Sequence, residues 1–376
     1  MQGSHLKPPY PGPGRGDLRP EPSPRHEPAG RPLRILVIAD PLLPVPPPGY
    51  GGTERIVFLL CNELSKLGHR VDLMAGPGSR RFSGRLHLHR RPSGKWWSRF
   101  FRKAWFQILS LHASHGADVV VNFGRLDYLT SLLLTKRPVI CRFGNPIRQS
   151  ELDWITRRRK GNLGFIGVSQ SQIGGLRFAA PVHVVPNAVD PAGIPFVPKP
   201  APEPHLVFLG RLTANKGADV AIRIAKRCGL PLKLAGSVPE EPGARDFFER
   251  EIRPHLGTEV EWLGDVDDAA KRTLLGNASA LLFPIRWPEP FGIVMIESLA
   301  SGTPVIATRC ASTPEVIEHG VTGFLCDSED EMAASVARLG TINRGACREA
   351  AEKRFSATRM TRDYLHVIHQ LLNETS

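Results

Sequence analysis

The sequence has no run of about twenty apolar residues, which is the length a helix needs to cross a bilayer. Its first apolar segment, residues 33–39, is short, is interrupted by Arg34 and is followed by Asp40, which does not fit a signal peptide. Cysteine is also scarce, with six in 376 residues and no Cys-x-x-Cys spacing, so we expect reduced thiols, with a single disulfide left as an alternative. These absences predict a cytoplasmic protein that is soluble or peripheral to a membrane.

Acidic residues are missing from one long stretch, residues 73–117, which contains nine Lys and Arg. The formal charge of +13 is uneven, because residues 1–190 carry a net +16 and residues 191–376 a net −3. A nucleic-acid binder is one interpretation of this charge, but no recognised binding motif accompanies it and the second half is acidic. We therefore expect no nucleic-acid partner.

Length and composition favour two globular domains, since 41% of the residues are apolar and 23% charged. Residues 1–32 hold nine prolines and five glycines and predict a disordered tail. Residues 191–204 hold six prolines and predict a stiff linker between an N-terminal domain, 33–190, and a C-terminal domain, 205–354. Residues 355–376 are predicted to form a final helix.

Short apolar runs alternate with helical patterns in both halves, which is typical of α/β domains with parallel sheets. Two such domains would enclose a ligand at the carboxyl ends of their strands. The predicted strands are 33–39, 71–75, 118–122, 139–142 and 165–169 in the first half, and 206–209, 232–235, 260–263, 280–283 and 304–307 in the second.

The strongest local motif is Trp-Pro-Glu-Pro-Phe-Gly at 287–292, which continues into a helix that contains Glu297. Glu289 lies in a proline-flanked loop and Glu297 about one and a half turns into the next helix, so both carboxylates can reach one small ligand. The backbone N–H groups of Gly292, Ile293 and Val294 begin the helix and suit a diphosphate. The alternative is that both glutamates are ordinary solvated acids.

A second motif, Gly-Arg-Leu-Thr-Ala-Asn-Lys-Gly at 210–217, follows the first strand of the second half. Arg211 and Lys216 place two cations on one short loop, where they can neutralise a leaving diphosphate without a metal. Asp265 and Asp267 have the spacing of a metal-binding Asp-x-Asp pair, but they precede a helix, where acidic residues favour the N-terminus.

Together with 300–307, 314–317 and 320–324, these motifs resemble the retaining glycosyltransferases of family 4, which have the GT-B fold of two Rossmann-like domains facing across a cleft. The glycine loop at 49–54 and residues 187–190 add weaker similarity, so the resemblance covers roughly residues 33–365. It implies transfer of a hexose from a nucleotide sugar to a sugar or lipid-linked acceptor, with no metal or other cofactor. It also implies a last helix that crosses back to the first domain.

The resemblance also implies roles for individual residues. Glu297 would bind the ribose hydroxyls, Arg211 and Lys216 the diphosphate, and Glu289 the donor hexose. The backbone would contact the donor at Gly51, Gly52, Gly292, Ile293 and Val294. It would contact the nucleobase of the donor at Gly236 and Gly264. A UDP-hexose is a slight preference over GDP-mannose, with no residue to support it.

This sequence departs from the family pattern in the loop after strand 139–142, where members commonly have a histidine and this chain has none. Arg142 and Asn145 are the candidates to replace that sugar contact. The departure leaves open a second function, a non-catalytic nucleotide-sugar-binding module.

Residues 95–108 have the pattern of a basic amphipathic helix. Trp97, Phe100 and Trp105 lie on its aromatic stripe, and Arg99, Arg102 and Lys103 lie mostly on the other side. One interpretation is docking on an anionic membrane that carries the acceptor. The other is that the stripe packs on the domain's own sheet.

Overall fold

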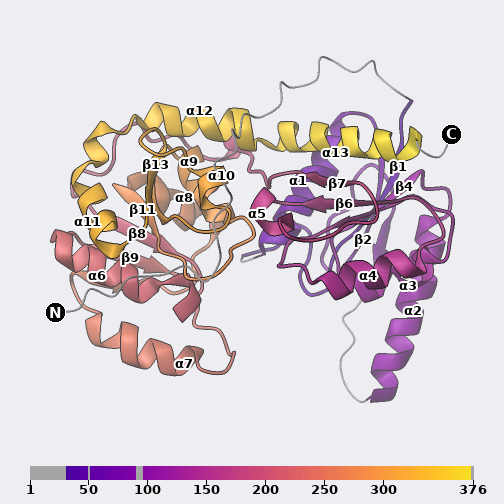
Figure 1. The fold of residues 1–376 in the computed structure, drawn as a ribbon, viewed down its shortest axis with the longest axis horizontal. Helices are drawn as coiled ribbons and strands as arrows, with labels where there is room; N and C mark the ends of the chain where they lie inside the picture. The colour runs from indigo at the N-terminus through magenta and orange to yellow at the C-terminus, as the bar shows by residue number, and fades with distance from the viewer. Residues whose placement is uncertain (1–30, 50, 90–95, 374–376) are drawn as a thin grey trace. The chain divides into compact units, whose positions relative to one another are not determined.

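The computed structural model describes residues 31–49, 51–89 and 96–373, so almost all of the predicted tail at 1–32 lies outside the described residues. The described chain forms two compact units (Figure 1). Unit 1 contains Ser169–Gln172 and Pro186–Arg359. Unit 2 contains the described residues up to Val168, then Ile173–Val185, and the chain from Met360 onward.

Unit 2 is built on a seven-stranded parallel sheet with the order β3-β2-β1-β4-β5-β6-β7. The chain leaves β1 toward one edge and returns to β4 on the other side of β1, so the topological switch point lies between these two strands. The strands are β1 (Arg34–Ile38), β2 (Arg70–Ala75), β3 (Leu86–Leu88), β4 (Val119–Asn122), β5 (Val139–Arg142), β6 (Leu163–Gly167) and β7 (Val182–Val184).

Helices cover this sheet because its central strands are apolar on both faces, as in β4, whose four residues are all buried. The core on one side gathers side chains from the sheet and from α2 to α4, including Leu36, Phe106, Leu132 and Ile155. The helices between β1 and β6 are α1 (Gly52–Lys66), α2 (Trp96–Ser114), α3 (Thr130–Leu133) and α4 (Gln149–Arg158), and the short α5 (Gln170–Ile173) follows β6.

Unit 1 contains a six-stranded parallel sheet with the order β10-β9-β8-β11-β12-β13, and its switch point lies between β8 and β11. Its strands are β8 (Leu206–Leu209), β9 (Leu232–Ala235), β10 (Val260–Trp262), β11 (Ala280–Phe283), β12 (Val305–Thr308) and β13 (Gly323–Cys326). Its helices are α6 (Ala218–Cys228), α7 (Ala244–Phe247), α8 (Asp268–Asn277), α9 (Ile293–Ala300), α10 (Thr313–Val316), α11 (Glu329–Ala337) and α12 (Arg344–Phe355).

The proline-rich segment after residue 190, predicted as a linker, packs onto unit 1. Arg344 of α12 is 8% exposed and donates to the carbonyls of Val197, Gly276 and Ala278 at 2.7–2.9 Å, and to Thr303 Oγ1 at 2.6 Å. Arg348, one turn later, donates to the carbonyls of Pro191, Ile194 and Ala300. The bonds to Pro191, Ile194 and Val197 satisfy backbone carbonyls of a segment whose regular structure is one 3-10 turn at Pro191–Gly193.

The chain passes between the two units more than once. Val189 pairs with the residues that join α12 to α13 (Ala357–Asn373), because its N–H donates to Phe355 O and its carbonyl accepts from Ala357 N–H, both at 2.9 Å. This pairing places the unit boundary at 185–186, five residues before the predicted one at 190–191. Most of α13 then packs on unit 2, where Tyr364 stacks on Phe123 at 5.9 Å.

Residues Ser169–Gln172 reach from the end of β6 into unit 1. The Glu315 carboxylate accepts the backbone N–H groups of Gln170 and Ser171 at 2.7 and 2.8 Å. The Ser169 hydroxyl donates to the carbonyl of Pro290 at 2.7 Å. Burial raises the pKa of Glu315, and the two N–H bonds act in the opposite direction by favouring its charged form.

Candidate functional site

The predicted donor residues gather at one edge of the unit 1 sheet. All its strands are parallel, so the loops after β8, β9, β10 and β11 emerge at the same edge. The first of these loops contains Arg211 and Lys216, and the last contains Glu289. Because β8 and β11 are neighbours, these two loops flank the switch point, where open α/β sheets bind ligands.

The Glu289 carboxylate is held by side chains from two loops of this edge. Its Oε2 atom pairs with Lys216 Nζ and accepts the Trp287 indole N–H at 2.7 Å. Lys216 Nζ also lies 4.9 Å from the centre of the Trp287 ring, within cation–π range. The Lys216 and Glu289 side chains are 16% and 13% exposed. Three groups from two loops thus hold one another, and Oε2 carries the contacts that fix the carboxylate.

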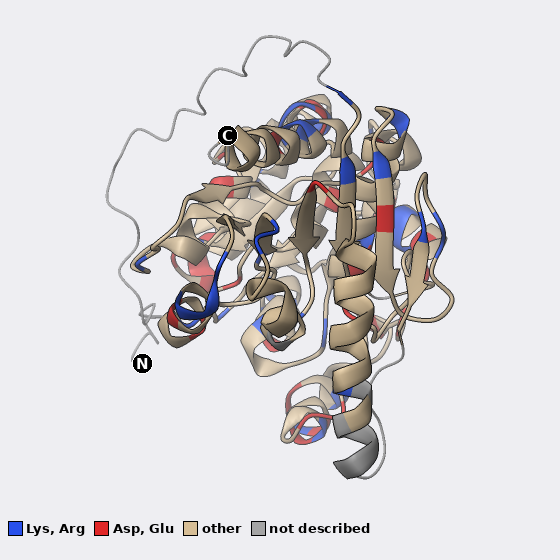
Figure 2. Ribbon diagram, turned by 90° about the vertical axis from the view of Figure 1, so that its right-hand side faces the viewer, with Lys and Arg blue, Asp and Glu red and all other residues tan. Residues whose placement is uncertain are grey.

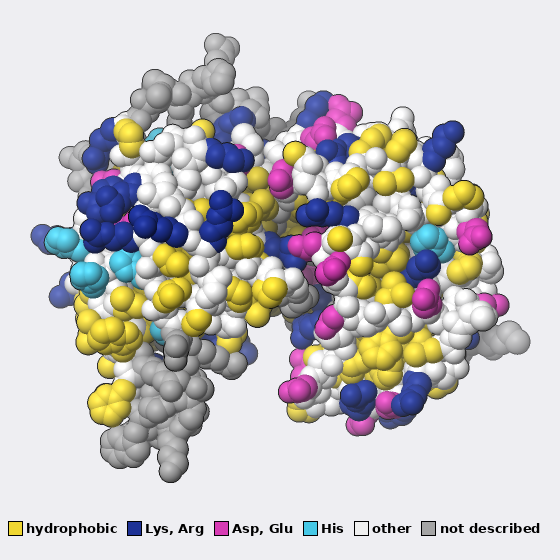
Figure 3. All heavy atoms as spheres, turned by 180° about the vertical axis from the view of Figure 1, so that it is seen from behind, with side chains coloured by type: hydrophobic (Ala, Val, Ile, Leu, Met, Phe, Trp, Pro, Cys, Tyr) yellow, Lys and Arg dark blue, Asp and Glu magenta, His cyan; other side chains and the backbone are white. Residues whose placement is uncertain are grey.

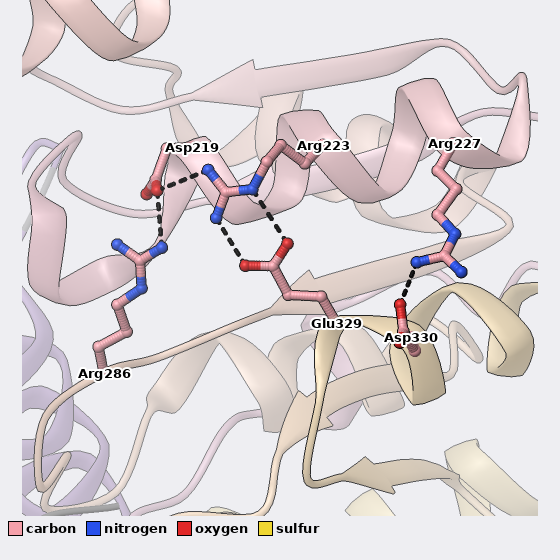
Figure 4. Close-up of polar contacts among 6 residues, drawn as sticks. All are labelled: Asp219, Arg223, Arg227, Arg286, Glu329 and Asp330. Atoms are coloured by element: carbon pink, nitrogen blue, oxygen red, sulfur yellow. Dashed lines mark hydrogen bonds and ion pairs between the residues drawn. The ribbon is translucent and has the colours of Figure 1, made fainter. Parts of the chain in front are cut away.

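Further contacts hold the same two loops together. Arg286 N–H donates to Asn215 O at 2.9 Å, and its guanidinium pairs with buried Asp219 at 2.7 Å. Figure 4 shows that Asp219 also faces Arg223 of α6, which reaches Glu329 of α11 through two hydrogen bonds. Hydrogen bonding to Glu329 is the main cause that raises the pKa of Arg223. This network links the loop after β11 to the helix that follows Lys216.

Glycines allow the loops at this edge to approach closely. Gly217 has φ 77°, and a Cβ atom there would lie 2.1 Å from the carbonyl oxygen of Pro284. Gly236 has φ 139°, and a Cβ would lie 2.0 Å from the carbonyl oxygen of Gly210. The Gly236 N–H donates to Gly264 O at 2.7 Å, so the two glycines predicted to face the base lie side by side.

The remaining donor residues occupy separate positions on this edge. Gly292 is the N-cap of α9 with φ 79°, and Ile293 and Val294 form the first turn of that helix, all three half-buried. Glu297, one turn further, pairs with Lys271 of α8 at 2.5 Å. Arg211 pairs with Glu241 at 3.3 Å, and both side chains are substantially exposed.

The predicted glycines of unit 2 lie in the loop after β1, at the switch point of that sheet. Gly51 is the N-cap of α1 and Gly52 its first residue, so the glycine loop leads directly into that helix. Glu54 of the first turn is buried, and burial raises its pKa, opposed by its own backbone N–H and by nearby Arg142. This loop therefore leads into a buried charged cluster that contains Glu54 and Arg142.

Arg142 belongs to that cluster and is not an exposed sugar contact in this structure. It is 4% exposed, its guanidinium lies 5.2 Å from the centre of the Phe123 ring, and it hydrogen-bonds the Tyr364 side chain of α13. Burial lowers the pKa of Arg142, whereas Tyr364 and Glu54 favour its charged form. Asn145, the other candidate, is exposed.

Helix α2 carries the predicted membrane surface, and its described side chains fall into two sets. Phe106, Ser110 and Ala113 are buried against the core. Trp105 and Ile108 are 60% and 58% exposed, and Phe101, Leu111 and Lys103 are also exposed. In Figure 2, α2 is the long vertical helix in front of the unit 2 sheet. The side chains of Trp97, Arg99, Phe100 and Arg102 lie outside the described set.

Charge is distributed differently over the two units. In Figure 3, Lys and Arg side chains gather on one face of unit 2, whereas acidic side chains are spread over unit 1. Exposed cations lie in the last turn of α4, namely Arg157 and Arg158, and shortly after α3 and α4, namely Lys136 and Lys160, and both helices lie in the layer that contains α2.

Within 31–49, 51–89 and 96–373, no three or more His, Cys, Asp or Glu side chains come together as a metal site. Asp267 instead caps α8, where it accepts the Ala270 N–H at 2.8 Å. In the same part of the chain, no helix combines the length and apolarity that crossing a bilayer requires. All six cysteines are unpaired thiols.

Two family models together match most of the chain. Residues 50–192 match the model of glycosyltransferase family 4, and residues 194–354 match the model of group 1 glycosyl transferases. The chain belongs to glycosyltransferase family 4. The predicted recognition and the predicted fold class are confirmed.

Solved structures place this family 4 glycosyltransferase in the GT-B fold. A glycosyltransferase involved in avilamycin A biosynthesis is 26% identical with a TM-score of 0.65, and the match covers 91% of this chain and 98% of that one. The Anabaena protein HepE, solved with UDP and glucose, is 18% identical with a TM-score of 0.69 over 90% of this chain and 100% of that one.

Among curated relatives, a glycogen synthase of Mycobacterium tuberculosis is 30% identical over 196 residues, which is 49% of this chain and 45% of that protein. The chain spans about half the length of the curated relatives it matches.

The structure adds three residues that the motifs of this glycosyltransferase had not assigned. Trp287 stands inside the Glu289 motif, and its place beside a proline-flanked carboxylate was a signal that could have marked it. Asp219 and Lys271 have no such local signal. Their partners, Arg286 and Glu297, lie 67 and 26 residues away in the sequence, so only the folded sheet brings them together.

Proposed function

We propose that this protein transfers a hexose from a nucleoside diphosphate sugar to a hydroxyl of a sugar or lipid-linked acceptor, with retention at the anomeric carbon. The observation that carries the proposal is the Glu289 carboxylate, held by Lys216 and Trp287 at the switch point of a Rossmann-like sheet. A carboxylate fixed through Oε2 can use Oε1 to accept hydrogen bonds from sugar hydroxyls.

In the proposed reaction, the bond between the anomeric carbon and the diphosphate oxygen breaks, and its electron pair leaves with the diphosphate. The acceptor oxygen bonds to the same face of that carbon, and the acceptor proton passes to the departing diphosphate. The main task of the protein is to stabilise the negative charge that grows on the leaving group and to position the reactants.

Arg211 and Lys216 are the cations proposed for that task, and we propose that no metal is needed. The exposed Arg211–Glu241 pair is weak, so a diphosphate can displace Glu241 at little cost. Lys216 has three N–H donors and can keep Glu289 while it binds a phosphate oxygen. An assay with and without EDTA tests this part, and loss of activity with EDTA would contradict it.

The first experiment is an assay of nucleotide release from a panel that includes UDP-glucose and GDP-mannose, with simple sugars and lipid-linked sugars as acceptors. UDP-glucose is the first donor to test, because HepE was solved with UDP and glucose. We expect release from one donor that depends on acceptor, and a product with the donor's anomeric configuration by proton NMR. Tight nucleotide-sugar binding without release from any combination would instead support the non-catalytic module.

We also propose that unit 2 docks on an anionic membrane through α2. Trp105 and Ile108 are exposed apolar side chains on a helix that also carries Lys103. Further exposed cations lie near the C-terminal ends of α3 and α4, in the same helical layer. Apolar side chains that insert between lipids and nearby cations, each worth about 1 kcal/mol, are the two ingredients of interfacial binding. Docking would bring a lipid-linked acceptor to the enzyme.

Vesicle flotation tests the docking surface. The protein should float with vesicles that contain phosphatidylglycerol and remain unbound with phosphatidylcholine alone. Replacing both Trp105 and Ile108 with serine should weaken binding about 10-fold or more, because two exposed apolar side chains that would insert between the lipids are lost. Leu67→Ser with Val321→Ser is the matched control, since these two residues are exposed elsewhere. Equal binding by the two double variants would end the α2 proposal.

A further inference from the structure

The pair between α8 and α9 joins a cation to the proposed ribose carboxylate. Lys271 Nζ lies 2.5 Å from Glu297 Oε1 and 3.3 Å from Asp268 Oδ1. The Lys271 and Glu297 side chains are 15% and 11% exposed, so the pair is mostly shielded but still reachable from solvent. Asp268 is more exposed, at 36%.

The location of this pair matters more than its contribution to stability. Removing two charges from water costs about as much as their attraction returns, so a largely buried ion pair is weak evidence for a stabilising role. Glu297 is in α9, whose N-cap is Gly292 in the proposed diphosphate-binding segment. Lys271 therefore places a positive charge about one turn along the helix from that segment, in contact with the carboxylate.

The chemistry of the two groups is complementary to a vicinal diol. A carboxylate accepts hydrogen bonds and an ammonium donates them, whereas each hydroxyl of a diol can do both. The Glu297–Lys271 contact uses Oε1, so the second carboxylate oxygen, Oε2, can accept a hydrogen bond from one hydroxyl. The ammonium has three N–H bonds and can turn one toward the oxygen of the other hydroxyl.

We propose that Lys271 and Glu297 together recognise the ribose diol of a nucleoside diphosphate, the carboxylate accepting from one hydroxyl and the ammonium donating to the other. This inference rests on the proposed function, because it concerns the donor site of that function. It makes Lys271 a specificity residue for ribose, and it predicts that both hydroxyl oxygens contribute to binding.

Calorimetric binding of ribonucleoside diphosphates and their 2′,3′-dideoxy analogues tests the inference. UDP and GDP are titrated first into the full chain, and the tighter binder is compared with its dideoxy form. The wild-type protein should discriminate about 100-fold against the dideoxy nucleotide, since two hydrogen bonds to charged groups are lost. In Lys271→Met this discrimination should fall by about 10-fold, because one of the two bonds no longer exists in either complex.

Two variants make the result specific. Lys353→Met is the matched control, since Lys353 pairs with Glu349 on an exposed face of α12, and it should discriminate as the wild type does. Lys271→Arg should restore part of the discrimination. Each ratio is measured within one variant and depends on affinities alone, so a lower fraction of folded Lys271→Met does not change it.

The outcomes are distinct. If the wild type binds neither UDP nor GDP, the proposed function fails, and this inference with it. If it binds one of them and Lys271→Met retains the full wild-type discrimination, the proposed function stands and the role of Lys271 is refuted.

Discussion

Replacing Lys216 with methionine should lower donor turnover by about 10²–10³-fold, the usual cost of removing one group that stabilises developing charge. The substitution keeps the length of the side chain and removes the ammonium from both the leaving diphosphate and Glu289. The fall should appear mainly in kcat, because the charge on the leaving group is greatest in the transition state. Nucleotide release under saturating donor measures it.

Lys226→Met is the control for this substitution, since Lys226 is an exposed lysine of α6 in the same unit. Its turnover should remain within about twofold of the wild type. Because Lys216 and Glu289 share a contact, the double variant Lys216→Met, Glu289→Gln should lose less than the product of the two single effects. A Lys216→Met enzyme with unchanged kcat would refute the assignment of Lys216.

Replacing Arg344 with methionine should destabilise unit 1 by about 3–5 kcal/mol. This guanidinium is 8% exposed and bonds three carbonyls and one hydroxyl, with no carboxylate among those partners. Methionine would leave these acceptors buried without donors, and segment 191–204 would lose its Val197 bond to α12 and keep only the Arg348 bonds to Pro191 and Ile194. The first thermal transition should fall by roughly 10 °C.

Thermal unfolding followed by circular dichroism measures that change, with Arg272→Met as the control because Arg272 is an exposed arginine of α8. Arg344→Lys should recover only part of the loss, since an ammonium cannot reach all four acceptors in the planar geometry of a guanidinium. If Arg344→Met unfolds at the same temperature as Arg272→Met, the buried bonds contribute little to stability, and other contacts hold the proline-rich segment.

The sequence predicted those elements whose pattern is complete within a few residues. Strands such as β8 and β11 are short apolar runs buried on both faces, and the structure has both at the predicted bounds. The edge strands β3 and β7 were missed, because each has three residues with a histidine at its centre and only partial burial. Whether such a short edge segment forms a strand depends more on its pairing with the neighbouring strand than on its own residues.

Residues 244–252 show a similar limit. They have a single helical pattern in the sequence, but the structure divides them into α7 and a π-helical turn at Phe248–Ile252. At the candidate site, the loop motifs predicted Glu289 and Lys216. The sequence did not predict the buried cluster around Arg142 or the Lys271–Glu297 pair. Those contacts join residues from different elements, so they depend on the packing of the whole unit.

The short reach of Ser169–Gln172 into unit 1 has a consequence for exchanging modules between relatives. A chimera joined near residue 193, where one family match ends and the next begins, would keep both sheets whole. It would nevertheless set Glu315 and the Pro290 carbonyl against a foreign segment at 169–172. That segment and the C-terminal helix, rather than the proline-rich junction, therefore decide which halves of this family are interchangeable.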